Sequence, residues 1–324
     1  MKNSDMSSLS LIGKVLSGAK SILIFPHGSI DGDALGSSVA LCLGLRSIGK
    51  TSYIMMDENI PDNIKFIENG CCSWDLDVVA EPEVCVCMDN GEISRIFTRQ
   101  ELFFKGKTTV LIDHHKSSEP FLDYNYIDVT SAASAEIIYD LLLSMGININ
   151  LAMAEAIYTG IVTDTGRFQY SNTTQRTHEI VSKLMDHNID QNKVSVEIYQ
   201  SVSHEKMRLQ TKILSTLEIV CNGQVAVAYM TKKMLSKTGA KDEETEGIVE
   251  ILRNLKGVEV AVFAKEKDNE GVKVSMRSKF AFDVSVIAQQ FEGGGHMKAA
   301  GFSSTEPIQT VLEKLIKTIE EKMQ

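Results

Sequence analysis

Short apolar runs that stop at polar residues recur through the first third of the chain. They cover residues 21–26, 51–56, 83–89 and 108–113. A segment with helical periodicity, residues 34–50, follows the first run and ends near Gly49. Strands that alternate with helices form parallel, doubly wound sheets, whose ligands bind beyond the carboxyl ends of the strands. We therefore predict an α/β fold with a mostly parallel N-terminal sheet.

The pattern changes twice in the remainder of the chain. Helical periodicity dominates residues 131–146, 150–166 and 173–188, and residues 190–216 are polar and only weakly periodic. A second α/β pattern then begins with an expected hairpin about Asn222-Gly223. Further strands are expected at 258–266 and 271–278, and an amphipathic helix at 306–324.

These changes in pattern indicate two domains, which a chain of 324 residues can form. The N-terminal domain is expected over residues 1–190 and a helical connection over 191–216. A smaller C-terminal α/β domain is expected over residues 217–324.

Composition restricts the classes of partner. The formal net charge of −10 argues against tight binding to long duplex nucleic acid, whereas a short phosphorylated substrate remains compatible with it. No apolar stretch approaches the roughly 20 residues that span a bilayer, and the N-terminus is a poor signal peptide, so we expect a cytoplasmic protein without a membrane partner. The cysteines form no C-x-x-C pair, which indicates buried thiols rather than disulfides or zinc ligands.

Four clusters of acidic residues and histidines interrupt the apolar pattern. They are His27 with Asp31 and Asp33, then Asp89, then Asp113 with His114 and His115, and finally Asp164. Taken singly, each cluster has an ordinary structural explanation. Asp33 could be the N-cap of the following helix, and Asp164 could form an ion pair with Arg167. Asp89 could be a solvated turn residue, and the histidine pair with its neighbouring aspartate could form a hydrogen-bonded cluster with a purely structural role.

Together, the clusters indicate metal chemistry. Imidazoles and several carboxylates at one end of one sheet provide nitrogen and oxygen ligands, which suit Mn²⁺ or a similar divalent cation. Two cations about 3.5–4 Å apart form a clamp for phosphoryl displacement. Adjacent residues on an extended chain point in opposite directions, so His114 and His115 are expected to have different roles.

In this order, the four clusters resemble the DHH phosphoesterase superfamily, which is named after a triplet that matches Asp113-His114-His115. The sequence FEGGGHMKAAGF at 291–302, preceded by SMRS at 275–278, resembles the DHHA1 substrate domain. The chain as a whole resembles the group of nano-RNases and 3′-phosphoadenosine-5′-phosphate (pAp) phosphatases. It departs from the family pattern at Ile30, where proline is usual, and at Met297, where lysine is frequent.

The resemblance implies roles for individual residues and an active site in the cleft between the two domains. One metal ion would be held by His27, Asp31 and Asp89, and the other by Asp33, Asp89, His114 and Asp164. His115 would face the substrate as a catalytic residue, with Asp113 orienting an imidazole. The substrate-binding residues would be Arg277, Gly293, Gly294, Gly295 and His296, although Arg277 could be a surface charge and the glycines a flexible turn.

The implied activity is hydrolysis of short, 5′-phosphorylated single-stranded RNA to 5′-mononucleotides, and of pAp to AMP and phosphate, with two divalent cations, expected to be Mn²⁺. Linear dinucleotides as substrates and a homodimer are left open. The alternatives are a cyclic-dinucleotide phosphodiesterase, an inorganic pyrophosphatase or polyphosphatase of the same superfamily, and a nucleotide sensor without catalytic activity.

Overall fold

The computed structural model describes residues 6–267 and 271–323, and the chain divides into two compact units, Met1–Ser201 and Val202–Gln324. Each unit has a sheet and a hydrophobic core of its own. The boundary after Ser201 falls inside the expected connection at 191–216, between helix α7 (Gln191–Tyr199) and helix α8 (His204–Leu214).

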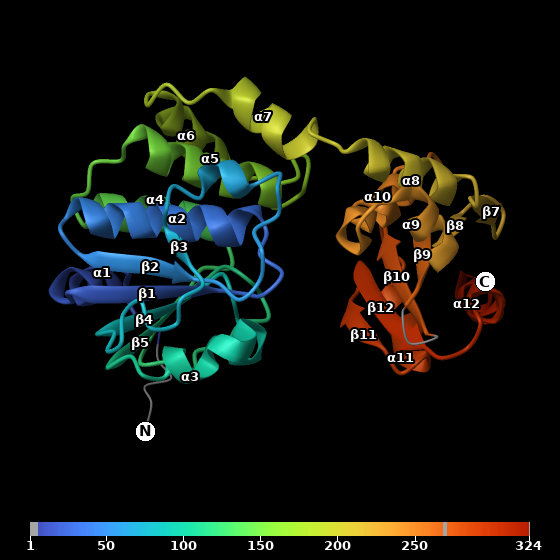
Figure 1. Cartoon of the computed structure of the whole chain (residues 1–324). Helices are drawn as coiled ribbons and strands as arrows, with labels where there is room; N and C mark the ends of the chain where they lie inside the picture. The colour runs from blue at the N-terminus through green and yellow to red at the C-terminus, as the bar shows by residue number, and fades with distance from the viewer. Residues whose placement is uncertain (1–5, 268–270, 324) are drawn as a thin grey trace. The chain divides into compact units, whose positions relative to one another are not determined.

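The sheet of the first unit is parallel throughout and has the strand order β3-β2-β1-β4-β5-β6 (Figure 1). Its strands are β1 (Ser21–Pro26), β2 (Thr51–Met55), β3 (Cys72–Ser73), β4 (Val84–Met88), β5 (Thr108–Asp113) and β6 (Tyr124–Ile127). The predicted doubly wound sheet is confirmed, and each of the four apolar runs is a strand within a residue or two of its predicted bounds. The two short edge strands, β3 and β6, were not predicted.

Helices cover both faces of this sheet. One face carries the larger core, to which α1 (Leu9–Gly18), α2 (Gly32–Ser47), α4 (Ser134–Ser144), α5 (Leu151–Asp164), α6 (Gln175–Met185) and the short helix η1 (Lys65–Ile67) contribute. The other face packs against η2 (Ile93–Arg99) and α3 (Gln100–Phe103). Helices α2 and α5 approach closely because Gly36 and Gly160 have no side chains at their contact, where a Cβ would overlap the opposite helix. This contact brings Asp33 on α2 towards α5, whose last residue is Asp164.

The second unit contains a mixed sheet with the order β11-β12-β10-β9-β8-β7. Its strands are β7 (Glu218–Val220), β8 (Val225–Met230), β9 (Val260–Glu266), β10 (Val272–Ser278), β11 (Gly294–His296) and β12 (Ala299–Ser304). The predicted hairpin about Asn222-Gly223 joins β7 and β8 as an antiparallel pair, and both residues have positive φ. The turn expected between β9 and β10 falls on residues 268–270, which lie outside the described residues.

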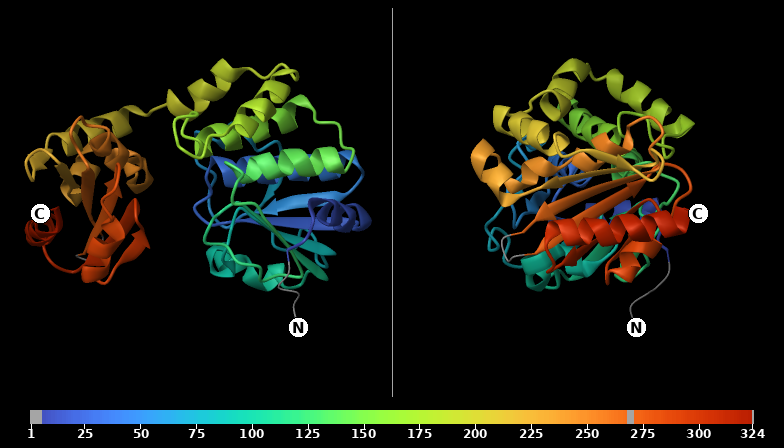
Figure 2. Two further views of the ribbon diagram at one scale, coloured as in Figure 1. Left: turned by 180° about the vertical axis from the view of Figure 1, so that it is seen from behind. Right: turned by 90° about the vertical axis from the view of Figure 1, so that its right-hand side faces the viewer.

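Helices also cover both faces of the second sheet. The predicted closing helix α12 (Ile308–Met323) and α11 (Val284–Gln290) pack on one face, and Figure 2 shows α12 crossing the strands. The other face carries α8, α9 (Lys232–Thr238) and α10 (Ile248–Arg253), with η3 (Asp242–Thr245) nearby. Within residues 6–267 and 271–323, no helix combines the length and the apolar character needed to cross a membrane.

Candidate metal centre

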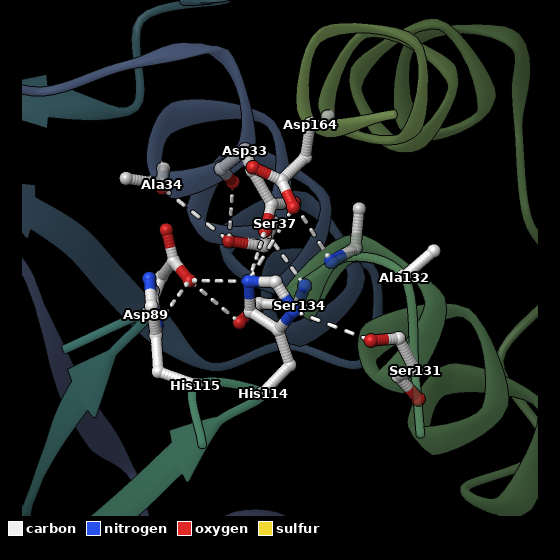
Figure 3. Close-up of polar contacts among 12 residues, drawn as sticks. Asp33, Ala34, Ser37, Asp89, His114, His115, Ser131, Ala132, Ser134 and Asp164 are labelled. Atoms are coloured by element: carbon white, nitrogen blue, oxygen red, sulfur yellow. Dashed lines mark hydrogen bonds and ion pairs between the residues drawn. The ribbon is translucent and has the colours of Figure 1, made fainter. Parts of the chain in front are cut away.

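The four predicted clusters come together at the carboxyl ends of three adjacent strands. His27 follows β1, Asp89 follows β4, and Asp113 ends β5. The strand order of the sheet reverses between β1 and β4, and this is the position at which doubly wound sheets bind their ligands. Helices α2 and α5 add Asp33 and Asp164 from the side (Figure 3).

His27, Asp31 and Asp89 form the first potential metal-binding group. Nε2 of His27 lies 3.5 Å from Oδ2 of Asp31 and 3.6 Å from Oδ2 of Asp89. The N-cap of α2 is Asp31 and not Asp33: Oδ1 of Asp31 accepts hydrogen bonds from the amides of Asp33 and Ala34. The same carboxylate therefore caps the helix with one oxygen and directs the other at His27.

His114 is the centre of the second group, which contains Asp33 and Asp164. Its Nε2 lies 3.8 Å from Oδ2 of Asp33, 3.6 Å from Oδ2 of Asp164 and 3.6 Å from Oδ1 of Asp89 (Figure 3). Its Nδ1 lies 3.2 Å from the carbonyl oxygen of Ser131. Because a carbonyl oxygen only accepts hydrogen bonds, this contact favours the tautomer with its proton on Nδ1, in which Nε2 has a lone pair for a cation.

Asp89 lies between the two groups and belongs to both. Its Oδ2 faces His27, whereas its Oδ1 faces His114 and accepts a hydrogen bond from Oγ of Ser134 at 2.9 Å. The side chain is 2% exposed, and the backbone has a φ of 53°, in the left-handed region that few residues other than glycine adopt. This arrangement allows one carboxylate to bridge two cations.

The electrostatics of the cluster also suit cations. Asp33 is buried, and its two oxygens accept hydrogen bonds from the amides of Ser134 (2.6 Å) and Ala135 (2.9 Å), at the start of α4. Even so, burial and the nearby negative charges of Asp89 and Asp164 raise the pKa of Asp33 well above its usual value. Burial likewise raises the pKa of Asp164 to about 6, although His114 opposes the shift. Buried carboxylates gathered this closely are costly unless positive charge is added.

The separations within the cluster leave room for cations between the ligand atoms. The imidazole and carboxylate atoms of the two groups lie 3.5–3.8 Å apart, beyond the length of a hydrogen bond. In the protein without metal, burial lowers the pKa of His27, but Asp31 and Asp89 outweigh this effect and raise it to about 10.

The two adjacent histidines have different surroundings, but they do not point in opposite directions: their ring centroids lie 4.6 Å apart, and both rings face Oδ1 of Asp89. The side chain of His114 is 11% exposed and that of His115 is 40% exposed. Nδ1 of His115 forms a 2.7 Å hydrogen bond with Oδ1 of Asp113, whose other oxygen accepts from Ser118. The bond to Asp113 raises the pKa of His115, although burial opposes this. His115 also lies 3.7 Å from Oδ1 of Asp89, so a third potential metal group exists, but its Nδ1 is already engaged by Asp113.

The expected substrate-binding residues of the second unit lie on two strands of its sheet or, for Gly293, directly before one. Arg277 on β10 pairs with Ala299 on β12, which in turn pairs with His296 on β11. Residues directly opposite each other in antiparallel strands share a face, so Arg277 and His296 lie on one face with only a small side chain between them. Nε of Arg277 donates to Oε1 of Glu250 at 3.1 Å, an ion pair that the sequence analysis did not predict.

The three glycines, for which a flexible turn was the alternative to substrate binding, lie mostly in an edge strand. Gly294 and Gly295 belong to β11, and Gly293 precedes it. A Cβ on Gly293 would overlap the carbonyl oxygen of Gly301, and Gly295 has a φ of 139°. The glycines therefore permit close strand pairing at this edge of the sheet, where the amide of Gly293 donates to the carbonyl oxygen of Ala288 on α11.

Two serines that contact the metal cluster were not predicted from the sequence. Ser131 and Ser134, which form hydrogen bonds with His114 and Asp89, lie in a stretch of small residues around the start of α4 that matches no motif.

The alternative of an ion pair between Asp164 and Arg167 is wrong within the described residues. The guanidinium group of Arg167 instead lies 4.0 Å from the ring centroid of Tyr199.

Comparison with known proteins identifies the family. Residues 21–161 match the DHH family, N-terminal domain, and residues 222–324 match the DHHA1 domain. A protein of Mycoplasma genitalium, described as uncharacterised, is 32% identical over 282 residues, which cover 86% of this chain and 85% of that protein. The chain belongs to the DHH family.

Two further relatives extend over both units. A Thermus thermophilus protein named bifunctional oligoribonuclease and PAP phosphatase NrnA is 28% identical over 293 residues, which cover 90% of this chain and 86% of that protein. The crystal structure of an exopolyphosphatase-related protein from Bacteroides fragilis has a TM-score of 0.89 at 27% identity, covering 97% of this chain and 96% of that one. The predicted DHH and DHHA1 domains are thus confirmed, and the chain is a DHH phosphoesterase.

Proposed function

We propose that this DHH phosphoesterase hydrolyses short, 5′-phosphorylated RNA to 5′-mononucleotides, and pAp to AMP and phosphate, with two divalent cations, of which Mn²⁺ is the expected one. The position of Asp89 carries the proposal, because its two oxygens face two separate groups of imidazole and carboxylate ligands. The name of the T. thermophilus relative supports the substrates.

The residues of the cluster fit two cations in number and in charge. His27, Asp31 and Asp89 would hold one cation, and Asp33, Asp89, His114 and Asp164 the other. Four carboxylates then balance two dications. When bound, such ions supply water whose pKa falls from 15.7 towards about 7, and they neutralise negative charge on the phosphoryl group.

His115 and Asp113 would handle the proton of the leaving group. The 3′-oxygen of a ribose is a poor leaving group, so a proton donor at that oxygen assists its departure. His115 fits this role because its bond to Asp113 favours the protonated ring and fixes its orientation, while its side chain stays accessible. Asp113 acts through His115 as a positioning residue.

The second domain would bind the nucleotide that is released. In both proposed substrates the leaving 3′-oxygen belongs to a nucleotide with a 5′-phosphate, so one binding site for that nucleotide serves both substrates. Arg277 would hold that phosphate with its planar guanidinium group, assisted by His296 and the backbone at Gly293, Gly294 and Gly295. Glu250 occupies one edge of the guanidinium group and orients it. The location of the active site in the cleft between the domains stays a prediction.

A polyphosphatase is the second candidate, because the B. fragilis protein with a TM-score of 0.89 is described as exopolyphosphatase-related. Hydrolysis assays with Mn²⁺ separate the candidates. The substrates are pAp, 5′-phosphorylated RNA dimers and longer oligomers, pyrophosphate, polyphosphate and a cyclic dinucleotide, and His114→Ala is the control for contaminating activity. We expect phosphate from pAp and 5′-mononucleotides from RNA. A preference for pyrophosphate, polyphosphate or the cyclic dinucleotide would reject the proposal, and inactivity on all substrates would indicate a sensor.

A further inference from the structure

An exposed aromatic ring lies beside the metal cluster and has no part in the function proposed so far. Phe97 belongs to η2, the segment that follows Asp89, and its side chain is 47% exposed. Its ring lies against Gly28, the neighbour of His27. The amide of Gly28 donates a 2.7 Å hydrogen bond to the carbonyl oxygen of Arg95, so the segments after β1 and β4 are joined at this point.

The backbone at this contact is unusual at both residues. Phe97 has a φ of 45° and a ψ of −117°, a conformation that strains any residue with a side chain. At residue 28 a Cβ would overlap the Phe97 ring, so any other residue there would displace the ring. The burial of an aromatic side chain could offset such strain, but nearly half of this ring stays in solvent. The conformation therefore presents a flat apolar surface at the rim of the cluster.

The substrate offers a matching surface. Single-stranded RNA is commonly bound by stacking its bases on aromatic side chains, and this contact tolerates any base. An RNA dimer has one nucleotide on each side of the phosphate that is cleaved, whereas pAp has only one nucleoside. In the proposed function the second domain binds the nucleotide whose 3′-oxygen leaves. The nucleotide on the other side of the cleaved phosphate is therefore left to the domain that contains Phe97.

We infer that Phe97 stacks on the base of the nucleotide downstream of the cleaved phosphate and thereby favours RNA over pAp. This inference rests on the proposed function, because it assumes RNA as a substrate. It makes Phe97 a specificity-determining residue for RNA. A ring that merely covers Gly28 would instead affect every substrate equally, through the position of the neighbouring His27.

The test compares two variants on three substrates with Mn²⁺. Phe97→Leu removes the aromatic face and keeps an apolar side chain, and Phe97→Trp keeps an aromatic face. The substrates are a 5′-phosphorylated RNA dimer, the same dimer without a base on its second ribose, and pAp. Phe104→Leu is a matched control, because Phe104 is 51% exposed and its ring packs edge-on against Phe103.

We expect Phe97→Leu to lower kcat/KM for the complete dimer about 5- to 150-fold, mostly through KM, because one stacked base contributes a change of that order. The abasic dimer and pAp should be hydrolysed as by the wild type, and Phe97→Trp should restore the dimer activity. Equal losses on all three substrates, losses on the dimer and pAp alike, or no loss on the dimer would each overturn the inference. Wild-type protein that cleaves neither RNA nor pAp would reject the proposed function itself.

Discussion

Replacing Asp89 with asparagine should weaken the binding of both metal ions, whereas replacing Asp31 should weaken only one. Asparagine keeps the size of the side chain and removes its charge. Both variants should fold: asparagine serves well as an N-cap at position 31 and tolerates the left-handed backbone at position 89. It can also keep the hydrogen bond that Asp89 accepts from Ser134.

The size of the effect follows from the contacts of each carboxylate. Two unit charges 4 Å apart interact with about 4 kcal/mol at an effective dielectric constant near 20. Loss of that amount weakens the affinity for an ion by about three powers of ten. The two oxygens of Asp89 face both groups, so both affinities fall in Asp89→Asn. In Asp31→Asn only the ion beside His27 is affected.

Calorimetric titration with Mn²⁺ and metal analysis after gel filtration measure these affinities, and pAp hydrolysis measures the rate. We expect two ions in the wild type, one retained ion in Asp31→Asn and neither in Asp89→Asn, which should be the less active variant. Thermal unfolding without metal checks that both variants are folded. Two tightly bound ions in folded Asp89→Asn would refute the bridging assignment.

Three other outcomes follow from the same geometry. His114→Ala should lose metal affinity, whereas His115→Ala should keep both ions and lose kcat; equal metal loss in the two variants would show that their roles are wrongly divided. Arg277→Ala should lower kcat/KM for pAp about 10- to 150-fold at normal metal content, because a charge-assisted hydrogen bond contributes about 1.5–3 kcal/mol; an unchanged preference for pAp over 3′-AMP would remove Arg277 from the site. In the metal-free protein, the free energy of unfolding, measured with urea, should fall as the pH rises from about 4 to 6. Burial raises the pKa of Asp164 to about 6, so in this range the folded state holds a proton that the unfolded chain releases. A free energy of unfolding that rises over this pH range in the wild type relative to Asp164→Asn would contradict a buried environment for Asp164.

The sequence predicts the sheet of the first domain well because its strands are buried on both faces. Such strands appear as continuous apolar runs with polar residues at their ends, as at Ser21–Pro26 and Val84–Met88. Strands β11 and β12 were missed as strands because glycine and alanine have little preference for extended structure. They are held there by pairing with β10, which is a tertiary effect.

For the candidate site, the sequence supplies the identity of the side chains but not their partners. The amides that bond Asp33 come from residues 134 and 135, about a hundred positions away in the chain. The partner of Arg277, Glu250, lies on a helix without a recognisable motif. The sequence around Phe97 likewise does not predict its positive φ, because phenylalanine rarely adopts that backbone conformation.

The central claim is that Asp89 bridges two cations. Diffraction from crystals of the Mn²⁺-loaded protein, recorded at the manganese absorption edge, tests it most directly. We expect two anomalous peaks about 3.5–4 Å apart, one beside His27 and Asp31 and the other beside His114 and Asp164, with Asp89 bound to both. A single peak, or two peaks of which only one contacts Asp89, would contradict the account.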